Sequence, residues 1–97
     1  MDAEHPQPTL DSRYKRAQDT SWSRLGDEVL VMQLQARRSH RLTGAAVPIW
    51  DRVIEGDSLA QVVETLQNSF DVDGTTLSSD VLSTVSLFLR ESLIESA

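Results

Sequence analysis

The chain has no cysteine, and none of its apolar runs approaches the roughly 20 residues that a membrane-spanning helix needs. Without cysteine there is no disulfide framework, no thiolate zinc site and no cysteine nucleophile. The first residues show neither the basic start nor the apolar segment of a secretion signal. We therefore expect a cytoplasmic protein that has no membrane partner.

The sequence also lacks the motifs of common catalytic and nucleotide-binding sites. It contains no phosphate-binding loop, no Gly-x-Gly-x-x-Gly and no Gly-x-Ser-x-Gly. Its two histidines, His5 and His40, have no second histidine or carboxylate at the spacing of a metal or catalytic pair. A chain of 97 residues builds one small core and no large cleft. We expect no enzyme activity, no catalytic residue, no metal site and no cofactor.

Basic residues are scarce in the C-terminal half. Residues 53–97 contain Arg90 as their single basic residue against eight acidic ones, whereas residues 13–52 contain eight basic residues and four acidic ones. The net charge of -6 therefore combines a basic middle with an acidic C-terminal part. Because the acidic part repels a phosphate backbone, the distribution argues against nucleic acid as a partner.

The N-terminal half has the pattern of a short sheet behind a tail. Residues 1–16 have no apolar period and are predicted to be a flexible tail, and residues 17–97 form the domain. Segments 21–25 and 28–34 flank the turn signal Gly26-Asp27 and predict a hairpin. The side chains assigned to the core face of its second strand are Leu30, Met32 and Leu34.

A third strand is predicted over residues 38–42, after a polar link. Its apolar content is a single residue, Leu42, which shares a face with His40 at a period of two. This composition suits a strand at the edge of a sheet. Two interpretations remain open for Arg37, Arg38 and Arg41: arginines protect an edge strand from aggregation, or they attract an acidic peptide that adds as a further strand.

Beyond Thr43 the apolar spacing changes from two residues to 3.6, which predicts helices. The first covers residues 43–55 and ends at Gly56; Pro48 moves its effective start to about Val47. The sequence Ser58-Leu-Ala-Gln is a capping box that starts a second helix.

A third helix begins at Thr76 or Ser78 as its cap and runs to about residue 91. Its apolar residues cover an arc of roughly 160°, wider than packing against one neighbour requires. Either a small bundle wraps the helix on two sides, or part of the arc lines a groove for a ligand. The residues of this arc are Leu77, Val81, Leu82, Val85, Phe88, Leu89 and Leu93.

The order of three strands and three helices, with particular residues at each junction, resembles the PqqD family, also called the RiPP recognition element, from about residue 22 to residue 95. The residues that carry the resemblance are Leu42-Thr43, Ile49-Trp50, Gly56, Leu59, Val62-Val63, Leu66, Asp80-Val81 and Leu93-Ile94-Glu95. The chain departs from the family pattern at Thr43, where Asn is usual, at Pro48, and at Ser92, where the family has Gly.

The resemblance implies an α+β fold of the winged helix-turn-helix type, with a three-stranded antiparallel sheet followed by three helices. It also implies that the protein binds the leader region of a ribosomally synthesised precursor peptide, which adds as a strand along the third strand and lies against the third helix. Arg37, Arg38, Ser39, His40, Arg41 and Leu42 would border the peptide on the strand side. Val81, Leu82, Val85, Phe88 and Leu89 would supply apolar pockets.

The partners implied are this precursor leader peptide and a modifying or processing enzyme, namely a leader peptidase, a cyclase or a radical enzyme. A lasso-peptide pathway with a separate leader peptidase is the preferred setting. Two alternatives remain at this stage. One is a winged-helix DNA-binding protein, although the third helix carries a single arginine. The other is a non-catalytic module that dimerises through its wide helical face.

Overall fold

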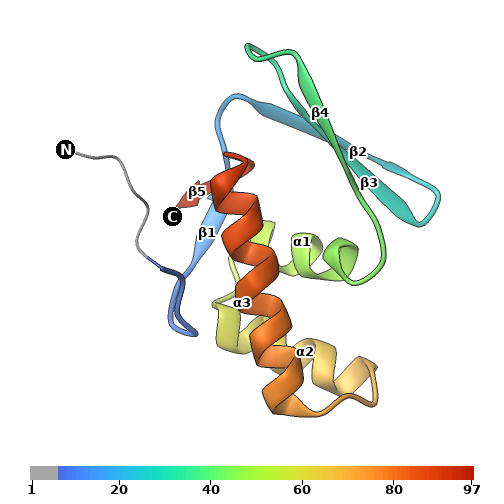
Figure 1. Ribbon diagram of the computed structural model, residues 1–97, viewed down its shortest axis with the longest axis vertical. Coiled ribbons are helices and arrows are strands. Elements are labelled where there is room, and N and C mark those ends of the chain that lie inside the picture. Colours follow the sequence, from blue (N-terminus) through green and yellow to red (C-terminus); the bar gives the residue numbers. More distant parts are fainter. Residues whose placement is uncertain (1–6) are drawn as a thin grey trace.

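The computed structural model describes residues 7–97; residues 1–6 of the predicted tail, with His5, lie outside the described residues. A three-stranded antiparallel sheet precedes three helices, as predicted for an α+β domain, and a second sheet joins the two ends of the described chain (Figure 1). None of the helices in residues 7–97 has the length and apolar character of a membrane span. In chain order the elements are β1 (Tyr14–Arg16), β2 (Thr20–Leu25), β3 (Glu28–Gln33), β4 (Arg38–Leu42), α1 (Ala46–Ile54), α2 (Leu59–Ser69), α3 (Gly74–Arg90) and β5 (Ile94–Ser96).

Part of the predicted tail is attached to the domain. The backbone N–H groups of Leu59 and Ala60, in the first turn of α2, donate to the carbonyl oxygens of Ser12 and Leu10 at 3.0 and 2.8 Å. β1 pairs antiparallel with β5, and Tyr14 is buried. Ordered structure therefore extends to the N-terminal side of the predicted boundary at residue 17. Local sequence did not indicate this because the strand partner lies at the other end of the chain.

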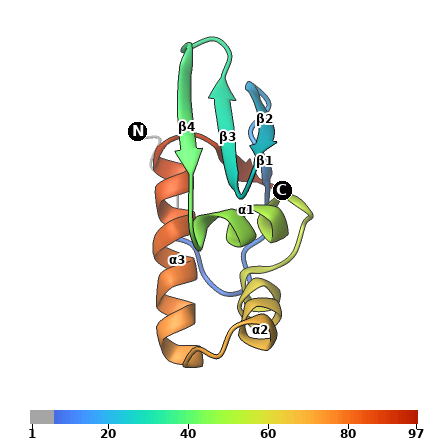
Figure 2. The ribbon, with the colours of Figure 1, turned by 90° about the vertical axis from the view of Figure 1, so that its right-hand side faces the viewer.

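The larger sheet has the order β2-β3-β4, so among the strands of residues 7–97 β4 pairs with β3 alone and its other edge is free (Figure 2). Gly26, with a φ of 65°, occupies the two-residue turn between β2 and β3, where the tight hairpin needs a positive φ. The hairpin and the edge strand are both confirmed.

The predicted core face of β3 is wrong. Val29 and Val31 are fully buried, and the register places Val29 opposite the buried Leu42. Because both faces of this strand carry apolar residues, the alternation does not determine which face the helices cover. The residues predicted to face the core are half-buried or exposed: Leu30, Met32 and Leu34.

α1 begins where the proline predicts. Starting at Ala46, the helix has Pro48 within its first turn, where the missing N–H has no intrahelical partner to lose. Gly56, with a φ of 98°, follows the helix and allows the chain to turn towards α2.

The capping box of α2 is confirmed, whereas the cap of α3 is not the predicted one. Ser58 Oγ accepts from Gln61 N–H at 3.3 Å, and Gln61 Oε1 accepts from Ser58 N–H at 2.8 Å. α3 is capped by Asp73, whose carboxylate accepts from Thr76 N–H at 3.1 Å, so this helix starts earlier than Thr76 or Ser78 would allow. An aspartate is among the strongest N-caps, and it precedes both candidates along the chain.

Trp50 of α1 lies in the centre of the core and is fully buried. Its ring meets Trp22 and Phe88 edge to face, with ring centroids 6.3 and 5.6 Å apart. α3 packs on α1, α2 and β5, which accounts for its wide apolar face. The remaining fully buried large side chains are Val29, Val31, Ile49, Val53, Leu59, Val62, Val81, Val85, Leu93 and Ile94.

Candidate functional site

The free edge of β4 presents backbone groups that no other strand in the described part of the chain uses. The N–H of Leu34, just beyond β3, donates to Asp19 C=O at 3.0 Å, so even-numbered residues of β3 bond towards β2. Alternation in an antiparallel ladder then leaves odd-numbered residues to bond towards β4. Their partners are Leu42 for Val29, His40 for Val31 and Arg38 for Gln33. By the same alternation, Ser39 and Arg41 direct their N–H and C=O groups to the free edge.

A groove runs between this edge and the C-terminal part of α3. Its volume is about 420 Å³. One wall is β4 and the other is the last turns of α3, with the chain that follows the helix (Figure 2). The groove thus has backbone hydrogen-bonding groups on one side and apolar side chains on the other. Its lining consists of Ser39, His40, Arg41, Leu42, Leu87, Phe88, Glu91 and Leu93.

His40 connects the two walls. Its Nε2 lies 3.0 Å from Gln33 Oε1, and the Gln33 amide nitrogen donates to the carbonyl oxygen of Glu91 at 2.9 Å. Because an amide oxygen only accepts, His40 Nε2 carries the hydrogen. His40 Nδ1 lies 3.9 Å from Glu91 Oε1. The imidazole is therefore held at the floor of the groove as a positioned polar group.

The arginines predicted for the site are all exposed. Arg41 Nε lies 3.2 Å from Glu28 Oε1, whereas Arg37 and Arg38 form no ion pair with any residue from 7 to 97. Arg37 has a φ of 56° and forms the last residue of the β3–β4 turn. The β4 side of the groove therefore carries positive charge, while Glu91 places a carboxylate on the α3 side.

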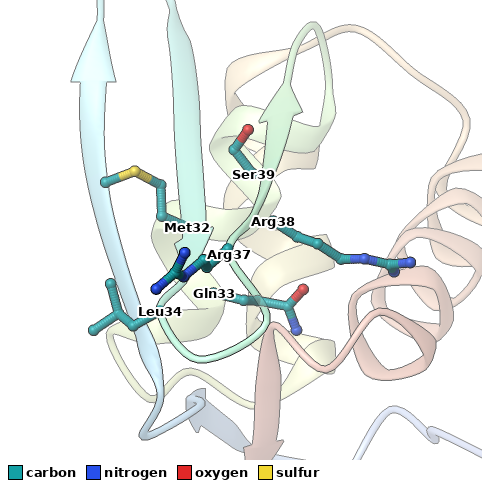
Figure 3. A pocket seen from close by; sticks show the side chains of 6 residues that line it. All are labelled: Met32, Gln33, Leu34, Arg37, Arg38 and Ser39. Atoms are coloured by element: carbon teal, nitrogen blue, oxygen red, sulfur yellow. The ribbon is translucent and has the colours of Figure 1, made fainter.

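A second, shallower hollow of about 290 Å³ lies at the turn that connects β3 to β4. Figure 3 shows Gln33 and Arg38 reaching towards α3, while Met32 and Leu34 lie on the opposite side of the hairpin. Arg37 and Ser39 complete the lining. The hairpin end thus combines exposed apolar side chains with guanidinium groups, next to the start of the groove.

The residues predicted on α3 have different positions from those expected. Val81 and Val85 are fully buried, Leu89 is buried, and Leu82 is half-buried against the core. Phe88 alone among these five lines the groove, from a buried position. The structure thus brings residues 39–42 and Phe88 together, while the other four lie within or against the core of the free protein.

Leu87 and Glu91 line the groove but are not among the predicted site residues. Leu87 is 42% exposed and faces β4 from the polar side of α3. It lies outside the continuous apolar arc, because that arc describes packing against α1 and α2. A leucine on an otherwise polar helix face was the available signal.

The family of the chain follows from comparison with known proteins. Residues 28–94 match the family model described as coenzyme PQQ synthesis protein D (PqqD). The match covers more than half of the chain, so this protein belongs to the PqqD family. No curated protein matches the chain.

Two solved structures have the same fold. One is TbiB1 in complex with the TbiA(beta) leader peptide: 22% identical, covering 86% of this chain and 96% of that one, with a TM-score of 0.80. The other is lasso peptide synthetase B1 complexed with the leader peptide: 17% identical, covering 87% and 99% of the two chains, with a TM-score of 0.80. The predicted α+β fold, with a three-stranded antiparallel sheet and three helices, and the predicted family are confirmed.

Proposed function

We propose that this protein captures the leader region of a ribosomally synthesised precursor peptide in the groove between β4 and α3. The peptide adds as a strand to the free edge of β4. The observation that carries the proposal is the combination of an unpaired strand edge with an adjacent groove of about 420 Å³. The two structural relatives, both described as complexes with leader peptides, support it.

Backbone bonds supply the part of the affinity that does not depend on sequence. Ser39 and Arg41 each offer one N–H and one C=O to an extended partner. β4 has five residues, which match a peptide stretch of roughly 17 Å at the rise of an antiparallel strand. The peptide gains main-chain bonds there without displacing a bond of the sheet.

Side chains on the groove select the peptide. On the added strand, alternate side chains point into the groove, where Leu87, Phe88 and Leu93 offer apolar contact. Acidic side chains are favoured next to Arg38 and Arg41 on the β4 side. The preferred ligand is therefore an extended segment with inward apolar residues and acidic residues near the arginines.

The protein acts as a carrier of substrate in this proposal. It holds the leader and presents the rest of the precursor to a processing enzyme such as a leader peptidase, which raises the effective concentration of precursor at that enzyme. A lasso-peptide pathway is the setting that one structural relative, lasso peptide synthetase B1, favours. No residue of this chain has to react.

A proline substitution at the strand edge tests strand addition. Ser39→Pro removes an N–H that faces outward, and it leaves the ladder to β3 intact because edge strands accept proline at such positions. Fluorescence anisotropy of a labelled leader, taken from the precursor encoded beside the gene, measures the affinity. We expect about tenfold weaker binding for Ser39→Pro.

The matched control is Ser39→Ala, which keeps the N–H and loses only the hydroxyl. We expect its affinity to stay within about twofold of the unaltered protein. Equal binding by the proline and alanine variants would contradict strand addition at this edge. Absence of binding by the unaltered protein at about 50 μM leader would contradict leader recognition itself.

A further inference from the structure

A second concave surface lies at the opposite end of α3 from the leader groove. It is a cleft of about 350 Å³ between the start of α1, the end of α2 and the beginning of α3. In Figure 1 this region lies below the sheet, where α2 and the N-terminal half of α3 come together. The cleft is lined by Gly44, Ala45, Pro48, Ile49, Leu66, Phe70, Val72, Leu77 and Asp80.

The rim of this cleft exposes large apolar side chains that the core does not use. Phe70 is 49% exposed and Val72 is 39% exposed, while the floor consists of the buried Ile49, Leu66 and Leu77. An apolar floor with half-exposed apolar walls is the usual form of a site that receives an apolar group from another molecule.

The charged residue that lines the cleft and the two that flank its rim in the chain are all acidic. Asp80 lines it, and Asp71 and Asp73 flank the rim residue Val72 in the chain. None of these three carboxylates forms an ion pair with another residue of the described chain, 7–97. The single basic residue after position 52, Arg90, belongs to the other end of α3. A ligand here gains from positive charge next to its apolar group.

The cleft and the leader groove differ in the sign of the charges beside them, and they are well separated along α3. Asp80 of the cleft lies in α3 and Glu91 of the leader groove caps the end of this helix, eleven residues later, which is roughly 16 Å along the helix axis. The arginine-bordered groove favours an acidic peptide, whereas the cleft disfavours one. A ligand that suits the cleft therefore differs in charge from one that suits the groove, and the two surfaces share no lining residue.

We propose that this cleft is a docking site for a partner protein, which inserts an apolar side chain that is flanked by lysine or arginine residues. The inference does not rest on leader binding, because it uses different residues and the opposite charge. It gives the protein one surface for an acidic peptide and another for a basic protein segment.

The probe is the peptide acetyl-Lys-Lys-Leu-Leu-Lys-Lys-amide, titrated to about 2 mM into the ¹⁵N-labelled full chain and followed by amide chemical shifts. We expect shifts at Ala45, Leu77 and Asp80, and none along β4. Val72→Ser and Asp80→Asn should each weaken binding about threefold to tenfold. Leu25→Ser and Asp27→Asn are the matched controls, since they change an exposed leucine and an exposed aspartate of the β2–β3 hairpin that do not line the cleft.

Two control peptides separate the contribution of the positive charges from that of the apolar side chains. Replacing the lysines with glutamates should abolish the shifts, and replacing the leucines with serines should reduce them severalfold. The proposal is overturned if the peptide causes no shift at the cleft, if the glutamate peptide binds equally well, or if the control variants weaken binding as much as the cleft variants. It is also overturned if sedimentation shows that the chain self-associates and that Val72→Ser prevents this self-association, because a second copy of the chain would then be the occupant.

Discussion

The end of α3 gives a prediction whose sign and size follow from backbone geometry. Ser92 has a φ of 61°, and its N–H donates to Leu89 C=O at 3.0 Å, while Leu93 N–H donates to Phe88 C=O at 2.9 Å. These two bonds are those of a Schellman motif, in which the left-handed residue is usually glycine. Ser92 is exposed. Ser92→Gly therefore relieves steric strain and leaves both backbone bonds in place.

The magnitude combines two opposing contributions. A left-handed conformation costs a residue with a Cβ about 1–2 kcal/mol, and glycine in turn loses about 0.5–1 kcal/mol more backbone entropy on folding. Ser92→Gly should thus stabilise the domain by about 0.5–1 kcal/mol. For a domain of this size the midpoint of thermal unfolding rises by roughly 2–8 °C.

Urea unfolding followed by tryptophan fluorescence measures this change, because Trp50 is buried in the native state. The matched control is Ser79→Gly, an exposed serine in the middle of α3, where glycine should cost about 0.5–1 kcal/mol. Opposite signs for the two substitutions are the expected result. If Ser92→Gly lowers stability as Ser79→Gly does, the explanation of the helix stop is refuted.

Two further comparisons test the assignment of core and groove. Val85→Asp places a carboxylate in the core and should unfold the domain, with loss of the helical circular dichroism signal, whereas Leu87→Asp should keep the fold and weaken leader binding about tenfold. A folded Val85→Asp variant with normal stability would contradict the burial of this residue. Ser58→Ala removes half of the capping box and should cost about 1 kcal/mol in urea unfolding, with Ser69→Ala as a control of smaller effect.

The elements that depend on local chemistry were predictable from the sequence. Ser58 and Gln61 identify the start of α2 because the two reciprocal bonds form within four residues. Gly26 identifies the hairpin because the tight turn between two neighbouring strands needs a residue with a positive φ. The start of α3 was predicted too late because Asp73, Thr76 and Ser78 can all cap a helix. Local sequence alone does not decide which of the three caps it.

What the sequence left open depends on contacts between distant segments. The buried face of β3 is decided by which side the helices cover, and β1 becomes a strand only because β5 returns to it. The same holds within the site. The arc of apolar residues on α3 describes packing against α1 and α2, so Val85 is core, while the groove residue Leu87 projects from outside that arc. The β4 half of the site was predictable because an edge strand is visible in its polar composition.

Amide hydrogen exchange at β4 is the most direct test of strand addition. In the free protein the amides of Ser39 and Arg41 face solvent and should exchange rapidly, whereas the His40 amide is bonded within the sheet. When the protein is saturated with leader peptide, we expect protection of Ser39 and Arg41 by a factor of about ten or more, with little change at His40. Saturation of the protein without protection of these two amides would contradict the binding of the leader as an added strand on β4.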